Sequence, residues 1–153
     1  MRVYLDACAL NRLSDDQSQP RIRAESEAVQ QILSLIMLGK VEWKASRVLE
    51  VELLQNPDLA KRTDSLDLLS YAGSLPKGSE QVRQRGRQLA AAGYGVFDAL
   101  HLAYAEEMQV DALLTTDDRF IRQAARGLGN PTVRVVNPLE WIKEVQPWLQ
   151  PKQ

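Results

Sequence analysis

The chain has 153 residues and a formal net charge of −1, with 19 Lys and Arg against 20 Asp and Glu. This length suits one domain, residues 1–153, with a sizeable core, and the charge balance shows no global basicity, although a local basic strip is enough to bind nucleic acid. The single cysteine excludes an internal disulfide, and no apolar run approaches the roughly 20 residues of a membrane-spanning helix. Because the first residues also lack the apolar stretch of a signal peptide, we expect a cytoplasmic protein.

In chain order, short apolar runs alternate with segments of helical periodicity. The apolar runs predict strands at residues 3–5, 41–44, 112–115 and 133–136. Residues 11–20 are polar and favour a short helix followed by a loop. Further helices are predicted at 21–38, 47–55, 58–72, 79–92, 97–108 and 120–126, with a last one opening at Asn137-Pro138. This alternation predicts an α/β fold, in which a central parallel sheet is flanked by helices on both faces.

Acidic side chains stand where predicted strands end. Asp6 and Asp117 each follow a strand, so both should lie along the carboxyl edge of the sheet. Asp98 opens a helix that enters the same edge, and a glutamate between residues 46 and 55 could complete a cluster. Crowded carboxylates raise one another's pKa unless a cation holds them, and Mg²⁺ and Mn²⁺ prefer such oxygen ligands. The cluster therefore indicates a metal site for hydrolysis of phosphodiesters.

Taken singly, two of these acids have an ordinary alternative. Asp98 and Asp117 could simply be helix-start acids that interact with backbone amides and the helix dipole. Asp6 is harder to explain in that way, because an acid that directly follows a buried strand has a desolvation cost unless it has a partner.

Four segments together resemble a PIN-domain ribonuclease, and most closely the VapC-type toxins of prokaryotic toxin–antitoxin pairs. They are VYLDACAL at 3–10, SRVLEVELL at 46–54, FDALHLA at 97–103 and LLTTDDRF at 113–120. They occur in the family's order, and the segment VVNPLEWI resembles the family's closing strand and helix. The resemblance implies a PIN-like fold in which four acids bind Mg²⁺ or Mn²⁺ and cut RNA.

Matched motif by motif, the resemblance assigns both the metal-binding and the catalytic role to Asp6, Glu52, Asp98 and Asp117. Thr115 matches a threonine that orients a carboxylate or a water near the metal. The sequence departs from the family after Asp6, where Ala7 and Cys8 replace the usual Thr followed by Asn or Ser. A polar contact near the metal is therefore expected to be lost.

Three neighbouring side chains need separate interpretation. Glu50 lies on the same short helix as Glu52, but about 160° away around a helix of 3.6 residues per turn, so only one of them can serve the cluster; the motif spacing favours Glu52. Cys8 is interpreted as a small buried residue and not a nucleophile. His101 is interpreted as a packed or hydrogen-bonded helix residue and not a catalytic base.

RNA would need positive charge near the acids. Arg83 and Arg87 are one helical turn apart, and Arg12 flanks the loop after Asp6, so these three arginines are candidates for contact with RNA phosphates. The alternative is that they form ordinary solvated surface, as most charge runs do. As partners we expect RNA, a cognate antitoxin and a second copy of the chain in a homodimer, and no membrane.

Other functions remain open at this point. One is a PIN nuclease with a housekeeping role in RNA processing. Another is an inactive RNA-binding or assembly module, which the retention of all four acids disfavours, since idle clustered carboxylates only repel. A phosphatase of the haloacid-dehalogenase type would need a second Asp where Cys8 stands, so it is disfavoured.

Overall fold

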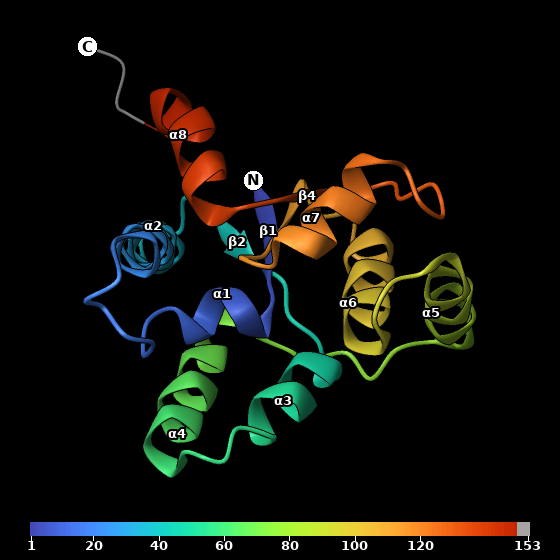
Figure 1. Cartoon of the computed structure of the whole chain (residues 1–153), viewed down its shortest axis with the longest axis horizontal. Helices are drawn as coiled ribbons and strands as arrows, with labels where there is room; N and C mark the ends of the chain where they lie inside the picture. The colour runs from blue at the N-terminus through green and yellow to red at the C-terminus, as the bar shows by residue number, and fades with distance from the viewer. Residues whose placement is uncertain (150–153) are drawn as a thin grey trace.

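The computed structural model describes residues 1–149 (Figure 1). Four short strands form one sheet: β1 Arg2–Leu5, β2 Glu42–Trp43, β3 Ala112–Leu114 and β4 Arg134–Val136. They lie in the order β2-β1-β3-β4, and every neighbouring pair is parallel. The predicted α/β fold with a parallel sheet is confirmed.

Helices connect the strands and cover the sheet. They are α1 Ala7–Asn11, α2 Pro20–Met37, α3 Arg47–Leu54, α4 Leu59–Leu68, the 3-10 turn η1 Leu69–Ala72, α5 Glu80–Ala92, α6 Val96–Glu107, α7 Asp118–Ala125 and α8 Pro138–Leu149. Figure 1 shows α2 and α8 together on one side of the sheet, with α6 and α5 on the other. This arrangement follows from the strand order, because right-handed crossovers that run in opposite directions along a sheet place their helices on opposite faces.

The register of the strands sets the level at which each chain segment leaves the sheet. Leu5 pairs with Leu114, and Leu114 pairs with Val136. One step further, the Asp6 amide donates to the Leu114 carbonyl at 3.2 Å, and the Thr115 amide donates to the Val136 carbonyl at 3.1 Å. The residues after β1 and after β3 therefore lie next to each other at the carboxyl edge of the sheet.

The largest difference from the sequence-based prediction is at the N-terminal helix. The prediction placed a short helix within residues 11–20, whereas α1 begins at Ala7, directly after the first strand, and has only five residues. The predicted helix at 58–72 is also divided, since α4 ends at Leu68 and a 3-10 turn completes it. Within the described residues, no helix is both long and apolar enough to span a membrane.

Candidate active site

Two of the predicted acids, Asp6 and Asp117, are N-caps of helices. For Asp117 this is the alternative of a helix-start acid that the sequence left open. The Asp6 Oδ1 accepts from the Ala9 amide at 2.9 Å and caps α1. The Asp117 Oδ1 accepts from the Arg119 and Phe120 amides at 2.9 and 3.3 Å and caps α7. Capping and a role in the site are compatible, because in both residues these amides use only Oδ1, so that Oδ2 of each can serve another partner.

Asp98 lies in the first turn of α6. Its pKa is raised to about 7, mainly by burial and then by the negative charges of Asp6, Asp117 and Glu52, while the charge of a protonated His101 opposes the rise. No hydrogen-bond donor within residues 1–149 contacts its carboxylate. A half-buried carboxylate among like charges and without a donor is the arrangement that a bound cation would relieve.

Asp6 is almost fully buried, with 1 % of its surface exposed. Its pKa is raised to about 6 because burial outweighs the opposing effects, which are the charge of a protonated His101 and then the hydrogen bonds from the Thr115 hydroxyl and the Ala9 amide. Thr115 is itself fully buried, and its hydroxyl accepts from the Asp117 amide at 3.2 Å. Thr115 thus connects the acid after β1 to the acid after β3, which supports its predicted orienting role.

The fourth acid comes from α3. The carboxylate of Glu52 lies 3.3 Å from Nε2 of His101, on α6, and its charge contributes to the raised pKa of both Asp6 and Asp98. Glu50 instead pairs with Arg47 at 2.8 Å on the same helix. The geometry therefore agrees with the choice of Glu52 from the motif spacing.

The thiol of Cys8 lies near all four acids. Burial raises its pKa, and so do, in decreasing order, the charges of Asp6, Glu52, Asp98 and Asp117. A thiol in such an electronegative position is a poor nucleophile, because the thiolate is the reactive form. This agrees with the interpretation that Cys8 is not a nucleophile, but its side chain is half-buried and lines a cavity, so the prediction of a buried residue is wrong.

The donor set fits a divalent cation that keeps part of its hydration shell. Among residues 1–149, no three His, Cys, Asp or Glu side chains form a preformed metal cage. Mg²⁺ does not need one, since it usually retains several waters and binds proteins through one or two carboxylates. Hard oxygen donors and excess negative charge are both present, so the residues suit Mg²⁺ or Mn²⁺ bound partly through water.

A cavity of about 320 Å³ adjoins the acids. It is lined by Cys8, Asn11, Arg12, Asp15, Thr116 and Asp117. The Asn11 Oδ1 is buried beside it and has no hydrogen-bond partner among the described residues. The cavity gives an RNA substrate room beside Asp117.

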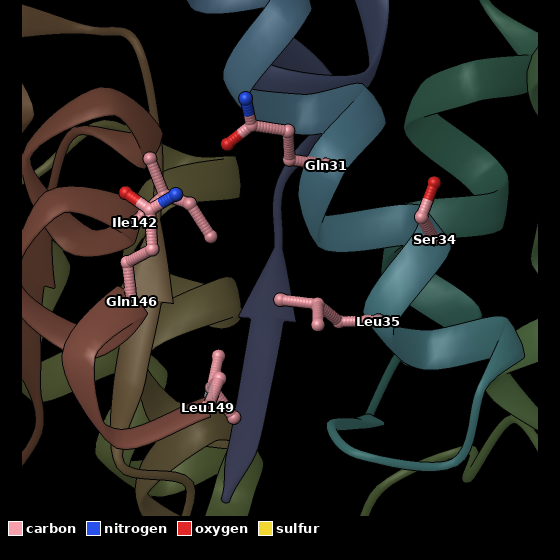
Figure 2. A pocket seen from close by; sticks show the side chains of 6 residues that line it. All are labelled: Gln31, Ser34, Leu35, Ile142, Gln146 and Leu149. Atoms are coloured by element: carbon pink, nitrogen blue, oxygen red, sulfur yellow. The ribbon is translucent and has the colours of Figure 1, made fainter. Parts of the chain in front are cut away.

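A second cavity, between α2 and α8, lies apart from this chemistry. Figure 2 shows its lining residues, Gln31, Ser34, Leu35, Ile142, Gln146 and Leu149, which are apolar or uncharged. It contains none of the predicted site residues, so its position gives no reason to place the reaction there.

The three arginines predicted to contact RNA are not brought together. Arg12 lines the cavity at the acids, although Asp15 and Glu25 already pair with it at 2.8 and 3.0 Å. Arg83 and Arg87 lie on α5, where both pair with Glu80 at 2.9 and 3.1 Å. Within the described residues they contact none of the four acids, and the RNA contacts of all three arginines stay a prediction.

Sequence analysis missed the buried Glu25, which organises the arginines beside the site. Its side chain is 2 % exposed and binds Arg12 at 3.0 Å, Arg21 at 3.4 Å and the Asn137 amide. Arg21 in turn forms two hydrogen bonds of 2.8 Å with Asp118, next to Asp117. No local signal marks Glu25 for burial, because two of these partners come from other elements.

Sequence analysis also missed the buried partners of His101. Tyr4 Oη lies 2.6 Å from Nδ1 of His101 and 2.7 Å from Oγ of Ser46. A signal for Tyr4 was available, since a tyrosine inside a buried strand needs a partner for its hydroxyl.

A family model described as PIN domain matches residues 3–126, which is well over half of the chain and includes all four acids. No curated protein matches the chain. The parallel sheet and the acids at its carboxyl edge agree with the family match. The chain belongs to the PIN domain family, whose members are generally metal-dependent nucleases.

Proposed function

We propose that this protein is an endoribonuclease that hydrolyses RNA phosphodiesters with Mg²⁺ or Mn²⁺ held by Asp6, Glu52, Asp98 and Asp117. The observation that carries the proposal is that Asp6 and Asp117 follow adjacent strands at one edge of the sheet, with Asp98 and Glu52 close enough for the charges to act on one another. Without a cation the like charges repel one another. Capping gives Asp6 and Asp117 a structural role as well, but no such role is evident for Asp98 among the described residues, and a bound cation would account for its place in the cluster.

Each residue of the site has a distinct task in this proposal. A bound divalent ion would activate a water and offset the charge that builds on the scissile phosphate. Asp6 and Asp117 are held rigidly by their capping hydrogen bonds through Oδ1, so their other oxygens have fixed positions. Thr115 keeps these two acids in register. Asp98, with its pKa raised to about 7, is suited to hold a proton at neutral pH or to release it when a cation binds.

The finer assignment is a toxin of a type II toxin–antitoxin system that acts in the cytoplasm. It rests on the resemblance of the four motif segments to VapC-type toxins. Such a toxin requires an antitoxin that inhibits the site. A basic side chain of the antitoxin placed among the acids would compete with the metal by charge pairing. We also propose that the protein forms a homodimer.

Removal of the metal is expected to lower RNA cleavage by a factor on the order of 10³, because a metal contributes several kcal/mol of charge stabilisation in the transition state. The measurement is cleavage of a circular RNA by the purified protein in Mg²⁺, in Mn²⁺ and in EDTA. Only an endonuclease can open a circle, so this substrate also distinguishes cleavage within the RNA from cleavage at its ends.

An Asp117→Asn variant purified in parallel controls for contaminating ribonucleases, which would remain in both preparations. Undiminished opening of the circle in excess EDTA would contradict the proposal.

Expression in a bacterial host tests the toxin assignment separately: the wild-type protein should arrest growth, and a housekeeping nuclease should not.

A further inference from the structure

Three fully buried side chains form a hydrogen-bonded row that ends at the carboxylate of Glu52. Ser46 Oγ lies 2.7 Å from Oη of Tyr4, Tyr4 Oη lies 2.6 Å from Nδ1 of His101, and Nε2 of His101 lies 3.3 Å from Oε1 of Glu52. The first three residues have 0 % of their surface exposed. They come from β1, from the N-cap of α3 and from α6, so the row joins the sheet to the two helices that carry Glu52 and Asp98.

The direction of these hydrogen bonds follows from the one group that can only accept. A carboxylate has no proton to give, so Nε2 of His101 donates to Glu52. An imidazole with that single proton accepts at Nδ1, and the Tyr4 hydroxyl therefore donates to it. Tyr4 Oη is then free to accept from the Ser46 hydroxyl, while Ser46 Oγ accepts from the Leu49 amide at 3.2 Å. In this direction every donor in the row has an acceptor.

The reverse direction leaves the row unsatisfied. If Nδ1 donated to Tyr4, the Tyr4 hydroxyl would have to donate to Ser46. Ser46 Oγ would then accept two hydrogen bonds, and its own proton would be buried without an acceptor in the row, which is unfavourable. If the imidazole were neutral with its one proton on Nδ1, the lone pair of Nε2 would also face the Glu52 carboxylate, which is unfavourable.

We propose that His101 is a positioning residue for Glu52, held in the Nε2–H tautomer by Tyr4 and Ser46. The inference rests on the proposed function only for the role of Glu52 as a metal ligand. A glutamate side chain has three flexible torsions, and repulsion from Asp6 and Asp98 favours rotamers that turn Glu52 away from the cluster. The Nε2–H of His101 opposes that rotation and keeps the carboxylate at the site, as hydrogen-bond partners of metal ligands commonly do. Because both ring nitrogens are engaged, His101 is not available as a base.

The tautomer can be measured directly. His101 is the only histidine of the chain, so the two-bond ¹H–¹⁵N spectrum of the untagged protein contains one imidazole. We expect the pattern of the Nε2–H tautomer in the metal-free protein at alkaline pH. The Tyr4→Phe variant removes the donor to Nδ1 and should show a mixture of tautomers. A wild-type spectrum with the Nδ1–H pattern would overturn the proposal.

Mn²⁺ affinity, measured by electron paramagnetic resonance without RNA, tests the effect on the site. His101→Leu is expected to weaken Mn²⁺ binding by about 10- to 100-fold. His101→Gln, whose amide can donate from nearly the same place, should recover most of that loss. Tyr4→Phe gives a second variant with little change in shape, in case His101→Leu does not fold.

A double-mutant cycle separates positioning from a general structural role. If His101 acts through Glu52, the double variant His101→Leu/Glu52→Gln should bind Mn²⁺ no more weakly than Glu52→Gln alone. Additive losses, or wild-type affinity in His101→Leu, would overturn the inference even in an active nuclease. A protein that binds Mn²⁺ with these dependences but leaves RNA intact would overturn the proposed function and not the inference.

Discussion

Replacing Asp98 with Asn is expected to lower RNA cleavage by a factor on the order of 10³ and, at the same time, to stabilise the metal-free protein. The loss of activity follows from weaker metal binding at the centre of the cluster. The gain in stability follows because Asn has nearly the same shape and removes a half-buried charge that burial, Asp6 and Asp117 all disfavour. Opposite changes in activity and stability are the signature of a functional residue.

The stability change has a defined pH dependence. The pKa of Asp98 rises from 3.8 to about 7 on folding, so the folded state binds more protons than the unfolded state between these values. The free energy of unfolding of the wild-type protein in EDTA should therefore fall as pH rises through this window, and the part due to Asp98 should be absent in the variant. Each pKa unit corresponds to about 1.4 kcal/mol. With allowance for partial exposure, we expect the variant to be more stable by about 1–2 kcal/mol at neutral pH.

Thermal melts in EDTA across pH measure this difference, which corresponds to a rise in Tm of about 2–8 °C for a domain of this size. Glu107→Gln is the matched control, because Glu107 is an exposed acid at the other end of α6; it should leave both activity and the pH profile unchanged. An Asp98→Asn variant with wild-type turnover would show that Asp98 is only a helix-start acid.

The sequence was sufficient for the parallel sheet and for the position of Asp6 and Asp117 at its carboxyl edge, because both depend on local patterns; the role of the four acids stays a prediction. Short apolar runs with an acid at the end identify buried strands and their carboxyl edge, and the motif spacing selected Glu52 over Glu50, with which the geometry agrees. The position of α1 was wrong because a five-residue helix shows too little periodicity to be detected. The only local sign of its start was Asp6, whose role as an N-cap was not considered.

The interactions that the sequence did not reveal join residues far apart in the chain. The row from Ser46 to Glu52 depends on a tyrosine 97 residues before His101, and the buried Glu25 depends on Asn137, 112 residues away. Such contacts leave no trace in periodicity or in short motifs. The pairing of Glu80 with Arg83 and Arg87 is different, because these residues lie three and seven positions apart on one helix, and the charge pattern could have indicated it.

The largest difference in RNA cleavage between variants at neighbouring positions is expected on α3. Glu52→Gln should lower metal-dependent cleavage by a factor on the order of 10² or more, because the amide loses the charge that holds the metal and can accept from His101 only as a neutral group. Glu50→Gln should leave most of the activity. It removes only a surface ion pair with Arg47, and such pairs contribute about 0–1 kcal/mol to stability.

The two variants are well matched, since they make the same chemical change two residues apart on one helix. Cleavage rates at saturating Mn²⁺ and Mn²⁺ affinities should be measured for both, with Tm as a check on folding. Their contrast depends on the helix register, because residues two apart point about 160° from each other. In the structure the Glu52 carboxylate is hydrogen-bonded to His101, and its charge raises the pKa of Asp6 and Asp98. If Glu50→Gln were the inactive variant, α3 would have to be rotated by nearly half a turn, and the row of hydrogen bonds from Ser46 to Glu52 could not exist in the active protein.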